Sequence, residues 1–371
     1  MKTATHGLVL SAVLVGLAFL IAPAEAQDLV REDLRIPVEA AAPQGLEALL
    51  VKPAGPGRRP LALINHAATR GTEDLSQLTA RQMLPELEVF ARRGWAAVTV
   101  MRRGYGSSGG MWAESYGPCT SPDYLSSISE AAADLRAAVA ALSTRPDIDA
   151  SRIISVGASS GGFATVALTA DPPPGLVAGI SFAGARGSPS SDHVCNPDAL
   201  VATFKSLGER SRVPMLWVFA ENDHFFSPAL AERMRQAFVA GGGNVTFVET
   251  PAFGDDGHFL FSPAGMPIWA PIVDRFLEKV DLKLLANPLP SPPVPALPPP
   301  PGLDAQGVQA FRQYLEGAPH KAFAIASDGS FGWRTARRTE QEARRNAMDN
   351  CGNNGATDCR VVAVDDARVE R

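Results

Sequence analysis

A serine flanked by glycines is the most chemically suggestive feature of this sequence. Residues 157–161 are Gly-Ala-Ser-Ser-Gly and match the pattern G-x-S-x-G around Ser159. In this pattern the chain turns sharply from a strand into a helix, which exposes the serine hydroxyl above the sheet. The N-terminus of the helix presents backbone N–H groups where an oxyanion would form. Ser159 is therefore predicted to be a nucleophile, with the N–H of Ser160 as one oxyanion donor.

The same pattern occurs a second time, around Ser108. The surrounding residues separate the two serines. Ser159 directly follows the apolar run 153–156, and a helical pattern begins at Gly162. Ser108 lies several residues beyond the preceding strand and is followed by Gly-Gly-Met-Trp, which does not resemble a helix start. We predict that Ser108 is a loop residue and not the nucleophile.

A serine nucleophile needs a base, and the chain contains six histidines. Where such a serine follows a strand, an acid and then a histidine follow in the chain, with the histidine after the final strand. His258 occupies that place. Asp223 follows the strand run 215–219 and is the predicted acid, which would orient the imidazole and stabilise the imidazolium. Glu221 is the competing carboxylate.

The second oxyanion donor should come from the loop that follows the apolar run 61–64. By position we predict the backbone N–H of Ala68. His66 in the same loop and Tyr105 after the next strand are candidate pocket residues. Loops near 105–124 and 186–196 are expected to lie over the site.

Alternating strand and helix patterns position these residues between Asp33 and about Val280. The alternation predicts an α/β fold with a mostly parallel sheet and helices on both faces. Two N-terminal strands, 34–38 and 46–51, are expected to form an antiparallel hairpin at one edge. The other apolar runs typical of strands are 61–64, 96–101, 153–156, 177–182, 215–219 and 245–248. The clearest helical patterns are 123–142, 162–168, 228–239 and 268–280.

The two ends of the chain differ from this central part. Residues 1–26 have the pattern of a secretory signal peptide, with Lys2, an apolar run and Ala-Glu-Ala at 24–26. A membrane anchor is the alternative. Residues 287–302 contain nine prolines and are predicted to be a linker. We therefore expect a hydrolase-type domain over 27–286 and a small α+β domain over 303–371.

The small domain is predicted from its own pattern. Helices are expected at 305–315 and 339–350, a β-hairpin over 321–335 with Asp-Gly at its turn, and a final strand at 360–364. No catalytic set of residues occurs in it. It resembles, weakly, small modules at the ends of some exported bacterial hydrolases.

The predicted export affects what the four cysteines are expected to do, because exported chains meet an oxidising environment. An even number of cysteines in an exported chain indicates disulfides, and four allow three pairings. Cys351 and Cys359 are close in sequence, which favours a local pair and leaves Cys119 with Cys195. Free buried thiols are the alternative. No His or Cys has the spacing of a zinc site, so we predict no metal.

Five segments in the right order resemble the α/β-hydrolase superfamily, close to its dienelactone-hydrolase-like and small-esterase branches. The resemblance covers about 34–280 and implies an eight-stranded sheet and an acyl-enzyme mechanism. That mechanism needs no cofactor. Two departures occur: Ala67 replaces the usual glycine after His66, and Ser159 stands where dienelactone hydrolases have a cysteine, which makes dienelactone a poor substrate. The segments are Asn65-His66, 102–106, 157–161, 221–223 and 257–259.

Composition adds a few limits. The net charge of −5 indicates no basic surface for nucleic acid. The sequence therefore predicts a periplasmic or secreted serine hydrolase acting on a small-molecule ester. A peptidase acting on short peptides or cell-wall material is the second hypothesis. The third is a non-catalytic protein whose C-terminal domain binds a cell-envelope ligand.

Overall fold

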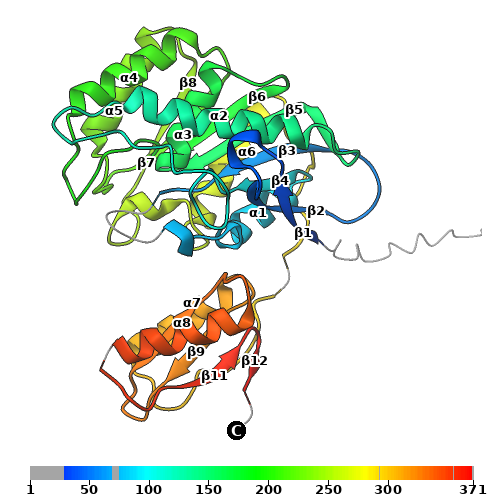
Figure 1. Cartoon of the computed structure of the whole chain (residues 1–371), viewed down its shortest axis with the longest axis vertical. Helices are drawn as coiled ribbons and strands as arrows, with labels where there is room; N and C mark the ends of the chain where they lie inside the picture. Colours follow the sequence, from blue (N-terminus) through cyan, green and yellow to red (C-terminus); the bar gives the residue numbers. More distant parts are fainter. Residues whose placement is uncertain (1–28, 69–74, 292, 354, 370–371) are drawn as a thin grey trace, which may run out of the picture.

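The computed structural model describes residues 29–68, 75–291, 293–353 and 355–369 (Figure 1). The predicted signal peptide lies outside the described residues. Within these ranges the chain forms two sheets, one of eight strands and one of four. No helix in this part of the chain has both the length and the apolar character needed to cross a membrane.

The large sheet has the order β1-β2-β4-β3-β5-β6-β7-β8. Strand β2 runs antiparallel to both of its neighbours, and the strands from β4 to β8 are parallel to one another. The predicted α/β fold with its N-terminal hairpin is confirmed. The strands are β1 (Leu29–Ile36), β2 (Leu46–Pro53), β3 (Arg59–Asn65), β4 (Ala96–Val100), β5 (Ile148–Ala158), β6 (Leu176–Phe182), β7 (Met215–Ala220) and β8 (Val245–Thr250).

Helices cover both faces of this sheet because each face carries its own apolar core. One core joins the sheet to α2 (Tyr124–Leu142), α3 (Ser160–Ala170), α4 (Pro197–Arg210) and α5 (Pro228–Ala240). The other joins it to α1 (Leu84–Ala91) and α6 (Met266–Lys279). The sequence analysis did not predict α1 and α4. A sequence signal for α4 exists: Asn196 caps its first turn and Pro197 begins it.

The C-terminal domain has the predicted elements. Its antiparallel sheet has the order β10-β9-β11-β12, with β9 (Ala322–Ile325), β10 (Phe331–Arg334), β11 (Arg360–Val364) and the short β12 (Ala367–Arg368). The helices are α7 (Ala305–Glu316) and α8 (Glu340–Asn353). Its small core includes Phe311, Tyr314 and Phe323.

The proline-rich segment lies partly against the large domain. The N–H of Leu289 donates to the carbonyl of Arg92 at 2.7 Å, and the Arg92 guanidinium donates to the carbonyl of Pro290. Two alanines of the C-terminal domain, Ala318 and Ala336, are buried in the same core as α1 and α6. The two domains are thus packed against each other, and the exact domain boundaries stay a prediction.

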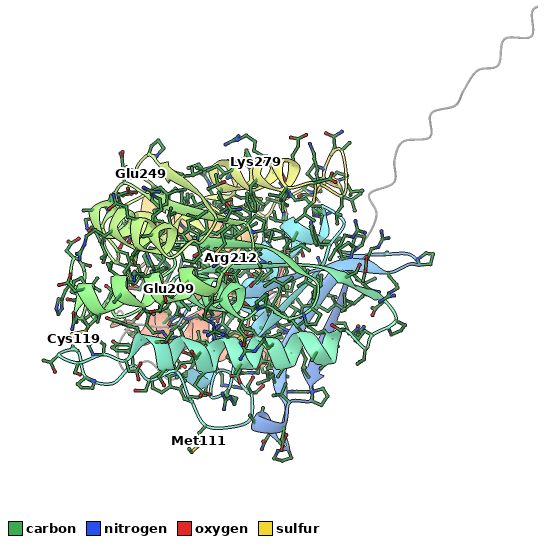
Figure 2. The ribbon with its side chains drawn as sticks, turned by 90° about the horizontal axis from the view of Figure 1, so that it is seen from above. Met111, Cys119, Glu209, Arg212, Glu249 and Lys279 are labelled. Carbon is green, nitrogen blue, oxygen red and sulfur yellow. A yellow bond between two sulfur atoms is a disulfide. The ribbon has the colours of Figure 1, made fainter. Side chains whose placement is uncertain are left out.

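Two disulfides join Cys119 to Cys195 and Cys351 to Cys359, which confirms the predicted pairing. The first ties the long connection between β4 and α2 to the loop that precedes α4. Figure 2 shows Met111 and Cys119 at the periphery of this connection, and Met111 is 87% exposed.

Candidate active site

Ser159 lies on a strained turn between β5 and α3. Its φ of 53° and ψ of −125° belong to a region that residues with a side chain rarely adopt. Its N–H donates to the carbonyl of Phe182 at 2.9 Å, and its carbonyl accepts the N–H of Phe163 at 2.9 Å. These bonds hold the turn on both sides, so the strain is maintained by the surrounding structure.

The two glycines of the motif are required by close packing. A Cβ atom at Gly157 would lie 2.3 Å from the carbonyl oxygen of Gly161. A Cβ atom at Gly161 would lie 2.2 Å from the carbonyl oxygen of Asn65 and 2.6 Å from that of His66. The start of α3 is therefore pressed against the end of β3, which brings the loop after β3 to the nucleophile turn.

Asp223 and His258 form a buried pair at the carboxyl ends of the strands. His258 Nδ1 and Asp223 Oδ2 are 3.2 Å apart, and both side chains are almost completely buried. Asp223 Oδ1 accepts the N–H groups of Phe225 and Phe226 at 2.7 and 2.9 Å, which fixes the carboxylate. The competing carboxylate, Glu221, is exposed.

Two residues that the sequence analysis did not assign to the site hold His258 in place. The Phe225 ring stacks on the imidazole, with centroids 3.8 Å apart and planes inclined by 6°. Asp256 Oδ1 accepts the N–H of His258 at 3.0 Å and that of His224 at 3.1 Å. The aromatic pair at 225–226, which begins two residues after Asp223, was the only sequence signal for Phe225.

Ala68 lies next to the nucleophile turn, and its N–H already has an acceptor. It donates to Ser160 Oγ at 2.6 Å. This bond brings the two predicted oxyanion donors together. A substrate oxygen would have to compete with the Ser160 hydroxyl for the Ala68 N–H.

His66 is buried, and both of its ring nitrogens bond to backbone groups. Nδ1 lies 2.9 Å from the carbonyl of Ala67, and the N–H of Arg102 donates to Nε2 at 3.2 Å. Burial, together with the charge of Arg102, lowers the pKa of His66 to about 3. The imidazole is therefore neutral at ordinary pH, and its contact with substrate stays a prediction.

A buried Arg–Glu–Arg cluster supports the loops around the site. Arg102 and Arg186 both donate to the Glu114 carboxylate, and the Tyr105 hydroxyl donates to Glu114 Oε2 at 3.0 Å. Burial alone would raise the pKa of Glu114, but the two guanidinium groups outweigh it and hold that pKa at about 2. The cluster joins the loops after β4 and β6, and the contact of Tyr105 with substrate stays a prediction.

Ser108 has a structural role in the loop after β4. Its hydroxyl donates to the carbonyl of Met101 at 2.6 Å and accepts the N–H of Glu47 at 2.9 Å. Both of these bonds are to backbone, and no helix begins directly after the residue. Its position differs from that of Ser159 in the way the sequence context predicts.

Among the described residues, no group of three or more His, Cys, Asp or Glu side chains is arranged to hold a metal ion.

The sheet order, the helices on both faces and the strand–turn–helix at Ser159 define the α/β-hydrolase class. Residues 47–258 match the model of the dienelactone hydrolase family. The chain belongs to the dienelactone hydrolase family and is a hydrolase of that family.

Solved structures with a similar fold come from several organisms. A putative dienelactone hydrolase from Klebsiella pneumoniae is 16% identical, with a TM-score of 0.47, over 68% of this chain and 99% of that one. Butyrate-bound esterase 2 from Thermogutta terrifontis is 17% identical, with a TM-score of 0.47, over 69% and 96%. Dipeptidyl peptidase 4 from Porphyromonas gingivalis is 18% identical, with a TM-score of 0.48, over 67% and 35%. The comparison with curated proteins returned no match.

Proposed function

We propose that this chain is an exported serine hydrolase that cleaves a carboxylic ester, or a related acyl bond, of a small molecule. The observation that carries the proposal is the buried Asp223–His258 pair, at the same sheet edge as the strained turn of Ser159. Parallel strands end at one edge, and β5 and β7 are separated only by β6. The two disulfides are consistent with an oxidising compartment.

The proposed mechanism uses three side chains and two backbone groups. His258 Nε2 takes the proton of Ser159 Oγ as the oxygen attacks the carbonyl carbon, and Asp223 keeps the imidazole oriented. The N–H groups of Ser160 and Ala68 stabilise the oxyanion. The tetrahedral intermediate collapses, and the leaving alcohol takes the proton from His258. Water then attacks the acyl-enzyme, again with His258 as base, and releases the acid.

The proposal is tested by labelling the mature chain with a fluorophosphonate probe. We expect the wild-type protein and Ser108→Ala to be labelled, and Ser159→Ala to remain unlabelled. Labelling of Ser159→Ala at the wild-type rate would contradict the proposed nucleophile. Absence of label from the folded wild-type protein would favour the non-catalytic hypothesis.

A second assay separates the two enzyme hypotheses. Unlabelled wild-type protein is given p-nitrophenyl butyrate and an aminoacyl p-nitroanilide under the same conditions. The hydroxide-catalysed hydrolysis rates of the two substrates give their intrinsic difference in reactivity. For an esterase, the ratio of kcat/KM on the ester to kcat/KM on the anilide is expected to exceed this intrinsic ratio by a wide margin. A preference for the anilide after this correction would identify a peptidase.

A further inference from the structure

A cleft lies where the large domain and the C-terminal domain meet, and it is separate from the residues assigned to the chemistry. Figure 1 shows the C-terminal domain, in orange and red, below the large domain. The cleft has a volume of about 800 Å³, which is within the range of ligand-binding pockets. Both domains contribute to its walls, with side chains that include Gln77, Gln82, Ser262, Gln313, Glu316 and Trp333.

The walls of the cleft are held together by a strap, residues 335–338, that follows β10. The carbonyl of Ala336 accepts the Thr79 hydroxyl at 2.8 Å, in a buried position. Arg337 donates to the carbonyl of Gln77 at 3.2 Å, and Arg338 donates to that of Leu78 at 2.8 Å. A cleft held in this way is preformed, so a ligand would bind without first having to order the two domains.

The polar groups of the cleft suit hydroxyl groups. Gln313 is exposed, and a side-chain amide both donates and accepts hydrogen bonds, as a hydroxyl does. Gln82 is also exposed; its Oε1 accepts the N–H of Thr79 at 3.2 Å, so it offers its amide N–H groups as donors. Trp333 is partly exposed and adds a flat apolar surface that can stack on a ring of C–H groups. Amides beside one aromatic ring are the chemistry that recognises a ring carrying several hydroxyl groups.

The charges of the cleft favour a neutral ligand. Arg337 is buried and its guanidinium donates to backbone carbonyls. These bonds are part of the contact between the two domains, so the guanidinium is not directed at a ligand in the cleft. The remaining lining charges are one cation, Arg334, and one anion, Glu316. A polyanion would meet the carboxylate without a cluster of cations to bind it.

We propose that the interdomain cleft binds a neutral saccharide, with Trp333 as the stacking residue and Gln313 as a hydrogen-bonding residue. The saccharide can be the alcohol part of an ester substrate or a separate envelope glycan that anchors the enzyme. The first source rests on the proposed function. The binding itself does not, because no step of the chemistry uses Trp333 or Gln313.

Binding is measured by isothermal titration calorimetry on the mature full-length Ser159→Ala protein. The probes are xylotetraose, cellotetraose and tetra-N-acetylchitotetraose, with tetragalacturonate as the anionic comparison. We expect saturable binding of at least one neutral tetrasaccharide, with a Kd of roughly 10 μM to 1 mM, and weaker binding of tetragalacturonate. Failure of all three to bind at about 5 mM, or equal affinity for the anion, would overturn the proposal.

Three variants, each checked by circular dichroism and thermal unfolding, locate the site. Trp333→Ala should weaken binding by roughly 10-fold, since a lost ring contact of about 1.4 kcal/mol is tenfold in Kd. Gln313 is exposed on α7, so Gln313→Ala should fold normally and weaken binding by about threefold. Val239→Ala, at an exposed apolar residue of α5 outside the cleft, is the control and should not change binding. Unchanged affinity in both cleft variants would refute the site.

Hydrolysis assays on the Ser159-containing protein distinguish the two sources of saccharide. If the saccharide is part of the substrate, Trp333→Ala lowers kcat/KM on an acetylated form of the tetrasaccharide that binds, and leaves p-nitrophenyl acetate unchanged. If it is an anchor, Trp333→Ala leaves both activities unchanged while saccharide binding is lost. If the protein hydrolyses no ester but still binds saccharide, the proposed function fails and the cleft proposal stands.

Discussion

The two serines of the duplicated motif differ in what their surroundings require of them. Ser108 uses its hydroxyl to join the backbone at Met101 to that at Glu47. Ser159 is held instead through its backbone, in a conformation that costs of order 1–3 kcal/mol in local strain. A protein retains such strain where the surrounding packing enforces it, and a functional site is the usual place.

At the residue scale, Asp223→Asn should separate orientation from charge. Asn retains an Oδ1 that can accept the N–H groups of Phe225 and Phe226, so the turn should remain folded. Its amide would present N–H groups toward His258 Nδ1, which favours the wrong tautomer. We expect kcat to fall by roughly 10³–10⁴-fold with little change in KM.

The control for this prediction is Glu221→Gln, two residues away and exposed. Steady-state kinetics on p-nitrophenyl butyrate should show it close to wild type. A large loss of kcat in Glu221→Gln, with Asp223→Asn near wild type, would show that Glu221, and not Asp223, is the acid that orients His258.

At the scale of single elements, α1 carries a buried carboxyl that the fold does not pair. Glu86 is 5% exposed, and its Oε2 has no hydrogen-bond partner among the described residues. Burial raises the pKa of Glu86 to about 7 from its ordinary value of 4.5. The native state therefore retains a proton that the unfolded chain releases between these two pH values.

This difference predicts a pH-dependent stability. The free energy of unfolding should fall as the pH rises from about 4.5 to about 7, by roughly 3 kcal/mol in total. Glu86→Gln removes the titration, so we expect the variant to be more stable than wild type at pH 8 and the difference to narrow toward zero near pH 4.5. Urea unfolding at both pH values measures this.

Glu249→Gln is the matched control for Glu86, because Glu249 is an exposed glutamate of β8 at the edge of the view in Figure 2. The free energy of unfolding of Glu249→Gln should differ from that of wild type by the same amount at both pH values, within about 0.5 kcal/mol. A Glu86→Gln difference that does not change with pH would contradict the buried-carboxyl explanation.

At the scale of the whole molecule, the two disulfides should differ in their contribution to stability. Cys119–Cys195 joins residues 76 apart, whereas Cys351–Cys359 joins residues 8 apart. In the chain-entropy account a longer loop gives more stabilisation, about 4.5 kcal/mol for the first and about 2.5 kcal/mol for the second. Double Cys→Ala variants of each pair, unfolded in urea, test this order.

The order of the two disulfide variants is the critical result. If loss of Cys351–Cys359 destabilised the protein more, packing around these sulfurs, and not loop closure, would be the main source of the stability that the disulfides contribute. The Glu114 cluster should keep the loops after β4 and β6 together without Cys119–Cys195, because Arg186 and Glu114 are bonded independently of it.

Much of the large domain could be predicted because its signals are local. Strand runs such as 215–219 and the helical spacing of 123–142 reflect burial against a sheet, and a residue's neighbours in sequence carry that pattern. The prediction failed for α1 and α4. Helix α1 is short, and its buried Glu86 interrupts the apolar pattern.

The sequence by itself determined the α/β class, the strand–turn–helix around Ser159 and the order of Asp223 and His258 after it, and it favoured the disulfide pairing that the structure has. These depend on residue type and spacing. Only the tertiary structure decided that Phe225 stacks on His258, that the Ala68 N–H bonds to Ser160 Oγ, and that the 335–338 strap joins the two domains around a cleft. Each of these requires a distance between chain segments, and distances between packed segments are set by the whole core and not by any local pattern.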